Sequence, residues 1–379
     1  MSINQPYIGL DCLSLPPNFS GAGYYIYYLV RGVLQQSNRS FSVAVFCKPE
    51  HVDLFTPFLK QNDKLISIPI RNRLHRLYFY EFELEKFLIK ENIKLFHATH
   101  YLCPPNNPRY KIITTFHDMG FLLFPHYYPL SKRKYFGKRL KTFLNRSHKI
   151  IAISKSTQDA IGKTFPECSD NILLIYPGTD HLLSETVIPN SAISIKKPYI
   201  LAVNSFEKRK NIPFIIKLFD YLKEKYGTNH KLVIIGHQAN DYQQILKERM
   251  KSRFFDDIHL LISVTNEQLI YFYRNSDFFI NASSYEGFGF SPMEAINFKL
   301  PSFIFGNWVV RELFDAHPYV FKNLEIENWA EYINEELNNN FINKILPKSI
   351  QHLTWQNTTT QFIELFNQLI SAEEPAVVP

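Results

Sequence analysis

The sequence is poor in cysteine, and the few cysteines that it has are scattered. Cys12, Cys47, Cys103 and Cys168 are the four cysteines, and no two of them form a C-x-x-C pair. Such spacing excludes the common zinc-ribbon and redox motifs. We therefore expect four free, buried thiols, with no disulfide framework and no cysteine metal site.

Long apolar runs are also missing, and we expect no signal peptide. No stretch approaches the ~18 consecutive apolar residues that can cross a bilayer. Residues 1–6 lack the basic and apolar regions of a signal peptide. No fixed-period repeat or low-complexity tract is present either. We expect a globular, cytoplasmic chain, and its 379 residues, 45% of them apolar, are enough for two domains with a core each.

Acidic residues are outnumbered, which favours anionic partners. The formal net charge is +7 and the pI is near 9.0, as expected for a protein that meets nucleic acid, a membrane surface or phosphorylated ligands. No recognisable nucleic-acid module accompanies this charge, so we expect no nucleic acid partner.

Residues 131–150 hold eight lysines and arginines and no acidic residue. Their apolar residues share one helical face: Tyr135, Phe136, Leu140, Phe143 and Leu144. Two interpretations are open. A basic amphipathic helix can lie on an anionic membrane, or the charges can be a solvated face over a core stripe.

The first half alternates between short apolar runs and segments with helical periodicity. This alternation predicts a parallel sheet, whose ligands bind at the carboxyl ends of the strands. Strands are expected at 7–11, 41–46, 64–68, 95–98, 111–116, 149–153 and 171–175, and helices at 24–36, 77–91 and 154–165, with Ser154 as an N-cap.

The second half repeats the alternation after a polar, aperiodic linker at 189–198. Strands are expected at 199–203, 231–235, 260–264 and 277–280, a helix at 212–226, and a capping box at 265–268. We predict three regions: an N-terminal domain at 1–190, a second domain at 191–354, and a helix from 355 that crosses back to the first domain and ends in a disordered tail from Ala372.

A glycine loop between an expected strand and helix carries two carboxylates. Glu286 lies on the loop, where it can accept hydrogen bonds from hydroxyls, and Ser291 and Glu294 form the pattern of a capping box. Glycines allow close approach of a ligand to the backbone, and the free N–H groups of a helix end bind anions. The combination suits a nucleotide sugar. The alternative is that Glu294 only caps its own helix.

Three strings resemble the retaining glycosyltransferases of family 4, which have the GT-B fold. They are Tyr285-Glu286-Gly287-Phe288-Gly289 with Glu294-Ala295, His117-Asp118 with Phe124-Pro125, and Arg209-Lys210-Asn211. The resemblance extends over roughly residues 8–370. It implies an α/β protein with two Rossmann-like domains whose parallel sheets face a central cleft, the first binding acceptor and the second binding donor.

The resemblance also implies residue roles. Arg209 and Lys210 would bind the donor diphosphate and neutralise it as it leaves, and Glu286 would hold sugar hydroxyls. His117 would lie at the reacting sugar, which makes these four residues the expected catalytic set. Other donor-binding residues would be Gly21, Gly23, Val264, Gly287, Phe288, Gly289 and, at the ribose, Glu294; Asp118 and, in second rank, His97 would lie on the acceptor side.

The sequence departs from the family pattern at three places. Tyr24 stands where the glycine loop of the family has an arginine, Asn204 replaces a further arginine of some relatives, and Asn307-Trp308 replaces a serine-rich turn. No D-x-D motif stands out, so we expect no metal and no cofactor, with the cations of the chain taking the place of a metal.

The function implied is retaining transfer of a hexose, with GDP-mannose the first choice of donor. The acceptor would be a glycan or a polyprenyl-diphosphate-linked glycan of lipopolysaccharide O-antigen or capsule synthesis, met at the inner face of the cytoplasmic membrane. Two alternatives stay open. One is a GT-B epimerase or phosphorylase, and the other is a non-catalytic protein that binds sugar nucleotides.

Overall fold

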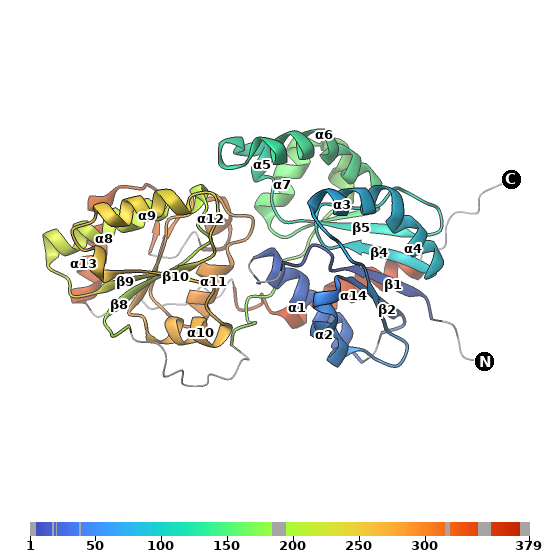
Figure 1. Cartoon of the computed structure of the whole chain (residues 1–379), viewed down its shortest axis with the longest axis horizontal. Coiled ribbons are helices and arrows are strands. Elements are labelled where there is room, and N and C mark those ends of the chain that lie inside the picture. Colours follow the sequence, from blue (N-terminus) through green and yellow to red (C-terminus); the bar gives the residue numbers. More distant parts are fainter. Residues whose placement is uncertain are drawn as a thin grey trace. The chain divides into compact units, whose positions relative to one another are not determined.

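The chain divides into two compact units, each built around its own sheet (Figure 1). The computed structural model describes residues 5–371 except 17, 18, 20, 38, 184–194, 315–318 and 340–349. The first unit comprises Met1–Leu123, Tyr128–Gly178 and Leu353–Pro379, and the second comprises Phe124–Tyr127 and Thr179–His352. The predicted domain boundary after residue 190 and the predicted tail from Ala372 lie outside the described residues.

The first unit contains a parallel sheet of seven strands in the order β3-β2-β1-β4-β5-β6-β7. All seven were predicted to within two residues. The order reverses between β1 and β4, which is where open α/β sheets bind ligands. The strands are β1 (Tyr7–Asp11), β2 (Ser42–Cys47), β3 (Lys64–Ser67), β4 (Ile93–Ala98), β5 (Lys111–Phe116), β6 (Lys149–Ala152) and β7 (Ile172–Leu174).

Helices cover both faces of this sheet (Figure 1). One face carries α1 (Ala22–Gln35), α2 (Val52–Phe55) and α14 (Trp355–Ser371). The other carries α3 (Arg73–Tyr78), the π-helical turn η3 (Phe79–Glu83), α4 (Leu84–Lys90), α6 (Leu130–Arg146) and α7 (Lys155–Thr164). Shorter elements are α5 (Gly120–Leu123) and the 3-10 turns η1 (Pro49–His51), η2 (Thr56–Phe58), η4 (Pro125–Tyr127) and η5 (Pro166–Asn171).

One predicted helix differs from expectation, and the N-cap of another is as predicted. The segment expected as one helix at 77–91 begins earlier, at Arg73, and contains the π-helical turn. The last helix, α14, packs in the first unit, where the ring of Phe362 stacks on that of His97 at 4.9 Å. Ser154 caps α7 as predicted, because its Oγ accepts a hydrogen bond from the Thr157 amide at 3.1 Å.

The second unit contains a parallel sheet of six strands in the order β10-β9-β8-β11-β12-β13. Here the order reverses between β8 and β11, so this pair marks the expected ligand site. The strands are β8 (Tyr199–Val203), β9 (Lys231–Gly236), β10 (Ile258–Ile262), β11 (Phe278–Asn281), β12 (Ser302–Phe305) and β13 (Val320–Phe321).

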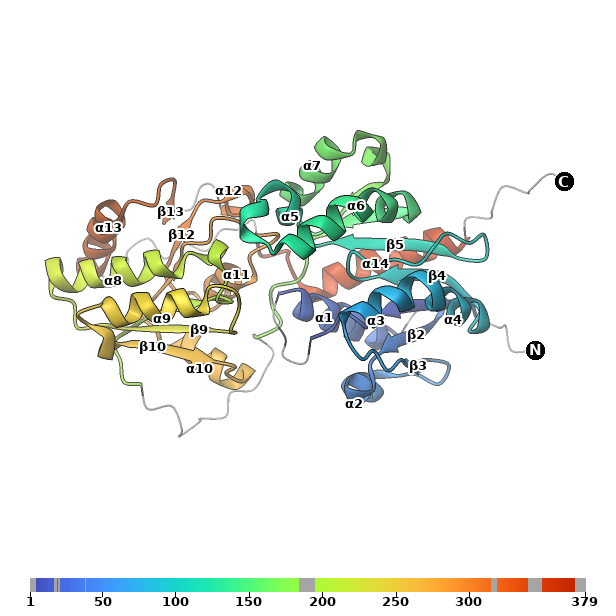
Figure 2. The same ribbon diagram turned by 45° about the horizontal axis from the view of Figure 1, so that its top comes forward.

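Helices lie on both faces of the second sheet as well (Figures 1 and 2). One face packs against α8 (Ile212–Tyr226), α9 (Tyr242–Lys251) and α13 (Ile326–Asn338). The other packs against α10 (Asn266–Asn275) and α11 (Phe290–Asn297). The remaining elements are α12 (Trp308–Phe314) and the 3-10 turns η6 (Lys208–Lys210) and η7 (Phe255–Asp257). The capping box predicted at Thr265 and Gln268 is confirmed.

The capping box predicted at Ser291 and Glu294 is wrong. Helix α11 already begins at Phe290, so Ser291 lies inside its first turn. The N-cap is Gly289, whose φ of 88° is in the left-handed region, and no side chain caps the helix. Glycine adopts this conformation without the Cβ penalty of other residues, so the turn is built from backbone and not from a serine hydroxyl.

The basic helix predicted in 131–150 exists as α6, and its apolar face belongs to the core. Phe136, Leu140, Phe143 and Leu144 are buried in the main apolar cluster of the first unit. The structure therefore supports the interpretation of a core stripe for this face, which is not available to a membrane. All four cysteines are free and buried, as predicted. Among the described helices, none is long and apolar enough to cross a bilayer.

Candidate active site

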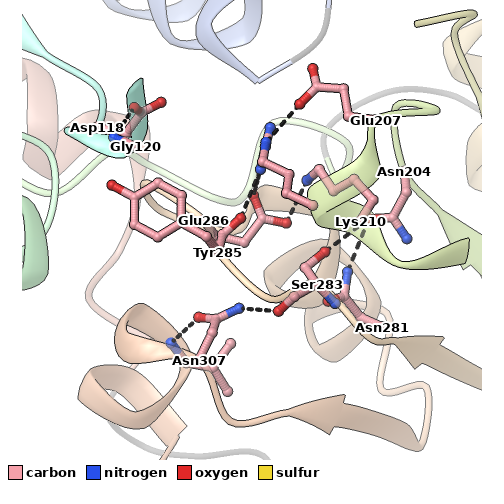
Figure 3. Close-up of polar contacts among 12 residues, drawn as sticks. Asp118, Gly120, Asn204, Glu207, Lys210, Asn281, Ser283, Tyr285, Glu286 and Asn307 are labelled. Atoms are coloured by element: carbon pink, nitrogen blue, oxygen red, sulfur yellow. Dashed lines mark hydrogen bonds and ion pairs between the residues drawn. The ribbon is translucent and has the colours of Figure 1, made fainter. Parts of the chain in front are cut away.

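Four charged side chains meet at the switch point of the second sheet (Figure 3). Glu207, Arg209 and Lys210 follow β8, and Glu286 follows β11 on the glycine loop. Since β8 and β11 are parallel neighbours, their carboxyl ends lie at the same edge of the sheet. The structure thus brings together three of the four predicted catalytic residues.

Glu286 accepts contacts from both predicted phosphate-binding cations. Its Oε2 accepts a hydrogen bond from Arg209 Nη1 at 2.8 Å, and its Oε1 is ion-paired with Lys210 Nζ. Arg209 Nη1 also donates to the carbonyl oxygen of Tyr285 at 2.9 Å, and its Nε donates to Glu207 Oε2 at 2.6 Å. Lys210 and Glu286 are 8% and 7% exposed, so this cluster is largely desolvated.

The pKa of Glu286 reflects these neighbours. Burial by itself would raise that pKa, but the charges of Lys210 and Arg209 outweigh burial and lower it to about 2. Burial and the Arg209 charge lower the pKa of Lys210, while Glu286 opposes this shift. Glu286 is therefore an ionised carboxylate at neutral pH, able to accept from hydroxyls, and the two cations can donate to phosphate oxygens.

Buried amides hold the loop that carries Glu286 (Figure 3). Asn204 Oδ1 accepts from Asn281 Nδ2 at 3.1 Å and from Ser283 Oγ at 3.4 Å. Asn307 Nδ2 donates to the carbonyl oxygen of Ser283 at 2.9 Å, and its Oδ1 accepts from the Val310 amide of α12 at 3.2 Å. Asn204 and Asn307 are positions where the sequence departs from the resembled family, and here both hold the loop that carries Glu286.

Glu294 lies on α11 and does not cap it. Its Oε2 accepts a hydrogen bond from the Tyr273 hydroxyl at 2.8 Å, and its Oε1 is 3.2 Å from His181 Nε2. The side chain is 3% exposed. Sequence reasoning missed Tyr273 and His181, because both are remote in the chain and neither belongs to a recognisable motif.

The other predicted donor residues occupy loops at strand ends. Gly287 is half-buried and Phe288 is buried in the loop after β11. Val264 follows β10, next to Ser263, whose φ of 58° turns the chain sharply. In the first unit, Gly21 precedes α1 with a φ of 29°, and a Cβ on Gly23 would lie 3.1 Å from Pro16. The φ of Gly21 and the contact of Gly23 with Pro16 explain why glycine occupies these two positions. The donor-binding roles stay predictions.

His117 follows β5 in the first unit, and its ring is held on two sides. Its Nε2 is 2.8 Å from the Thr99 carbonyl oxygen, and the ring of Tyr25 lies edge-on at 4.9 Å. A carbonyl only accepts, so Nε2 carries the proton and the neutral ring presents Nδ1 as an acceptor. Burial lowers the pKa of His117 although the Thr99 hydrogen bond and the Asp118 charge oppose this. The neutral form is thus favoured, as an acceptor from a hydroxyl requires.

Asp118 organises the turn that leads into α5. Its Oδ1 accepts from the Gly120 amide at 2.7 Å, and its own amide donates to the Tyr101 hydroxyl at 2.9 Å. The Tyr101 hydroxyl in turn donates to the Asp118 carbonyl oxygen at 3.0 Å. This geometry agrees with an orienting role, while contact with an acceptor stays a prediction.

His97 is placed in the core of the first unit. It has no exposed surface, and its Nε2 lies 2.8 Å from the Thr115 hydroxyl. Burial lowers its pKa to about 3. The geometry therefore favours a structural role for His97, which was the alternative interpretation of a lone histidine at a strand end.

Asp11, at the end of β1, is a buried carboxylate that sequence reasoning missed. The Tyr80 hydroxyl donates to its Oδ2 at 2.5 Å, and burial raises its pKa to about 6. Among the residues that the structure describes, no three or more His, Cys, Asp or Glu side chains are grouped so that they could hold a metal ion. The expectation of metal-free chemistry is not tested by this geometry.

Two family models match adjoining parts of the chain. "Glycosyltransferase Family 4" matches residues 19–181, and "Glycosyl transferases group 1" matches residues 184–352. The first match contains His117, and the second contains Arg209, Lys210 and Glu286.

Curated proteins and solved structures are similar over most of the chain. The O-antigen chain mannosyltransferase B of Escherichia coli is 24% identical over 73% of this chain and 74% of its own length. The O-antigen chain mannosyltransferase RfbU of Salmonella typhimurium is 26% identical over 68% of this chain and 71% of its own length. The sucrose-phosphate synthase of Thermosynechococcus elongatus superimposes with a TM-score of 0.75 at 17% identity, covering 97% of this chain and 100% of that one. WaaG, a glycosyltransferase involved in lipopolysaccharide biosynthesis, superimposes with a TM-score of 0.70 at 14% identity, and the match covers 97% of this chain and 100% of WaaG. The chain is a glycosyltransferase with the GT-B fold and belongs to family 4 of these enzymes.

Proposed function

We propose that the protein is a retaining mannosyltransferase that uses GDP-mannose in the assembly of a surface polysaccharide. The cluster of Arg209, Lys210 and Glu286 at the switch point of the second sheet is the observation that carries this proposal. The similarity to two O-antigen chain mannosyltransferases supports the choice of mannose and of O-antigen or capsule as the product.

The proposed mechanism begins with an exchange of partners in this cluster. Arg209 and Lys210 turn their N–H groups from Glu286 to the donor diphosphate, and Glu286 is then free to accept hydrogen bonds from sugar hydroxyls. As the bond from the anomeric carbon to the diphosphate oxygen breaks, negative charge grows on the leaving oxygen. Cationic donors held in a desolvated site stabilise that charge more than water does.

The proposed stereochemical course is departure and attack on the same face of the sugar. Glu286 is paired with two cations, which makes it a poor nucleophile, and we assign no carboxylate to a covalent intermediate of the kind found in retaining hydrolases. The departing phosphate takes the proton of the acceptor hydroxyl, so the new glycosidic bond keeps the anomeric configuration. His117 accepts from a hydroxyl at the reacting sugar, which its neutral ring permits.

We propose a glycan or a polyprenyl-diphosphate-linked glycan as the acceptor, bound by the first unit. An acceptor of this kind is anchored in the cytoplasmic membrane, which suits a basic protein at the inner face. The net charge of +7 supports this location, because anionic lipids attract basic surfaces.

A thermal-shift panel with GDP-, UDP- and dTDP-sugars tests the donor, because a ligand that binds the folded state raises its melting temperature. GDP-mannose should give the largest shift and GDP a smaller one. A larger shift with a UDP- or dTDP-sugar would contradict the donor assignment. A shift without turnover in the presence of acceptor membranes would favour a binding protein, and donor consumption without a new glycoside would favour an epimerase or phosphorylase.

A further inference from the structure

An apolar strip lies exposed on α3 and η3 of the first unit. Leu74, Tyr78 and Phe82 are 78%, 53% and 59% exposed. They are spaced four residues apart, which places them on one face of a helical segment. The rings of Tyr78 and Phe82 lie 5.0 Å from each other. These three residues are called the α3 strip below.

The side chains of the α3 strip do not pack in the apolar core of the first unit. Other residues of the same segment, among them Phe79, Tyr80 and Leu84, are buried in the apolar cluster beneath it. Single exposed apolar side chains need no explanation, but a contiguous group marks an interaction surface. Met250 of the second unit, which is 65% exposed, is an example of a single exposed apolar side chain.

Cations surround the α3 strip on two helices. Arg71 and Arg73 are exposed at the start of α3. Helix α6 is tied to η3, because Arg139 and Arg146 both pair with Glu81, the latter at 2.9 Å. These two pairs also neutralise Glu81, which is one of the two acidic residues next to Phe82; the other is Glu83. Both helices cover the same face of the sheet (Figure 1).

Helix α6 adds exposed positive charge on the same face of the first sheet as the α3 strip. Lys134 and Lys138 are exposed, and they lie on the side of α6 opposite Phe136 and Leu140, which face the core. The apolar face of α6 cannot enter a membrane because it is packed on the sheet. Its charges can still act at a surface for which the α3 strip provides the apolar contact.

We propose that the α3 strip, with Arg71, Arg73, Lys134 and Lys138 around it, docks on an anionic lipid bilayer. Leu74 and Phe82 would enter the boundary between headgroups and acyl chains, and Tyr78 suits the interface because its ring is apolar and its hydroxyl is polar. The cations would meet the anionic headgroups. A nucleic acid would satisfy the cations but would leave Leu74 in water. The inference rests on this surface alone and does not depend on the donor or the transfer reaction.

Vesicle flotation with the full chain tests the proposal. Vesicles of phosphatidylcholine with phosphatidylglycerol should bind the protein, and vesicles of phosphatidylcholine alone should bind it at least ~10-fold less. The triple variant L74S/Y78S/F82S should lose at least ~10-fold of the binding to anionic vesicles. The triple variant R73Q/K134Q/K138Q should bind anionic vesicles about 100-fold more weakly, because each cation near a charged surface contributes about fivefold to the affinity.

Matched control variants distinguish binding through this surface from an effect of any exposed apolar side chains or of net charge. M250S/I262S removes two exposed apolar side chains of the second unit, and K90Q/K94Q/K163Q removes three exposed cations elsewhere on the first unit. Both should bind vesicles as the wild type does, and all variants should keep the wild-type melting temperature. The proposal is overturned if the α3-strip variant binds like wild type, if the controls lose as much, or if duplex DNA displaces the vesicles.

Discussion

At the scale of single residues, the site depends on a carboxylate whose charge is shared between two cations. The family resemblance implied that Glu286, Arg209 and Lys210 act on one donor, and the structure places each after a strand at the switch point of one sheet. The resemblance did not predict that Glu286 pairs with both cations. Strand order brings residues to one edge, but which side chains touch depends on rotamers and on the loop contacts of Asn204 and Asn307.

Replacing Lys210 by alanine should reduce turnover by at least ~10²-fold, the scale of losing one electrostatic donor to a developing charge. The matched control is Lys208→Ala, because Lys208 is exposed in the same turn and touches neither Glu286 nor Arg209 through any contact that we describe. Steady-state rates with saturating donor check this. Near-wild-type turnover of the Lys210 variant would remove that residue from the catalytic set.

Replacing Glu286 by glutamine should change the response of stability to acid. The pKa of Glu286 is about 2 in the folded chain against an ordinary value of 4.5. Its ionised form therefore stabilises the fold above pH 4.5, and this contribution is lost as pH falls from 4.5 towards 2. The stability difference between wild type and variant should shrink over that window in urea unfolding at a series of pH values. The exposed Glu331→Gln is the control, and a constant difference for Glu286→Gln would contradict the ion pairing.

At the scale of elements, strand and helix positions followed from periodicity, whereas helix starts and exposed faces did not. The Ser-Pro-x-Glu pattern indicated an N-cap at Ser291, but the left-handed turn at Gly289 begins α11 two residues earlier. Glu294 is then directed to Tyr273 and His181, which are distant in sequence. Likewise, periodicity showed that α6 has an apolar face but could not tell whether sheet or membrane covers it.

The turn before α11 gives a prediction about backbone strain. A Cβ at Gly289 would find space, since Val309 lies 3.9 Å away, but a φ of 88° is unfavourable for alanine. Gly289→Ala should therefore lower the free energy of unfolding by about 1–2 kcal/mol. Gly137→Ala in the exposed part of α6, where a Cβ meets nothing within 4 Å, should raise it by about 1 kcal/mol. Chemical unfolding measures the free energy of unfolding of both variants. The same change in that free energy for both would contradict strain at Gly289.

At the scale of the whole molecule, the two sheets with their reversed strand orders were the most predictable feature. Alternating strands and helices specify parallel sheets, and the order reversal places β1 beside β4 and β8 beside β11. The predicted central cleft concerns the arrangement of the two units and stays a prediction. The helix α14, which follows the second unit in sequence, packs in the first unit through Phe362 and Phe366.

Metal-free catalysis can be tested on the intact enzyme. If Arg209 and Lys210 neutralise the diphosphate, an excess of EDTA should leave the transfer rate within about twofold of its value with Mg²⁺, because cationic donors then supply the charge stabilisation. A loss of at least tenfold that Mg²⁺ or Mn²⁺ restores would show that a divalent ion takes part.

The central claim is best tested by following mannose from GDP-mannose into product with lipid-linked acceptor and the purified chain. Our account predicts one GDP released for each new mannoside, with the α-configuration of the donor retained in the ¹H–¹³C coupling at the anomeric carbon. A β-linked product would contradict retention, and consumption of donor without a new glycoside would contradict transfer itself.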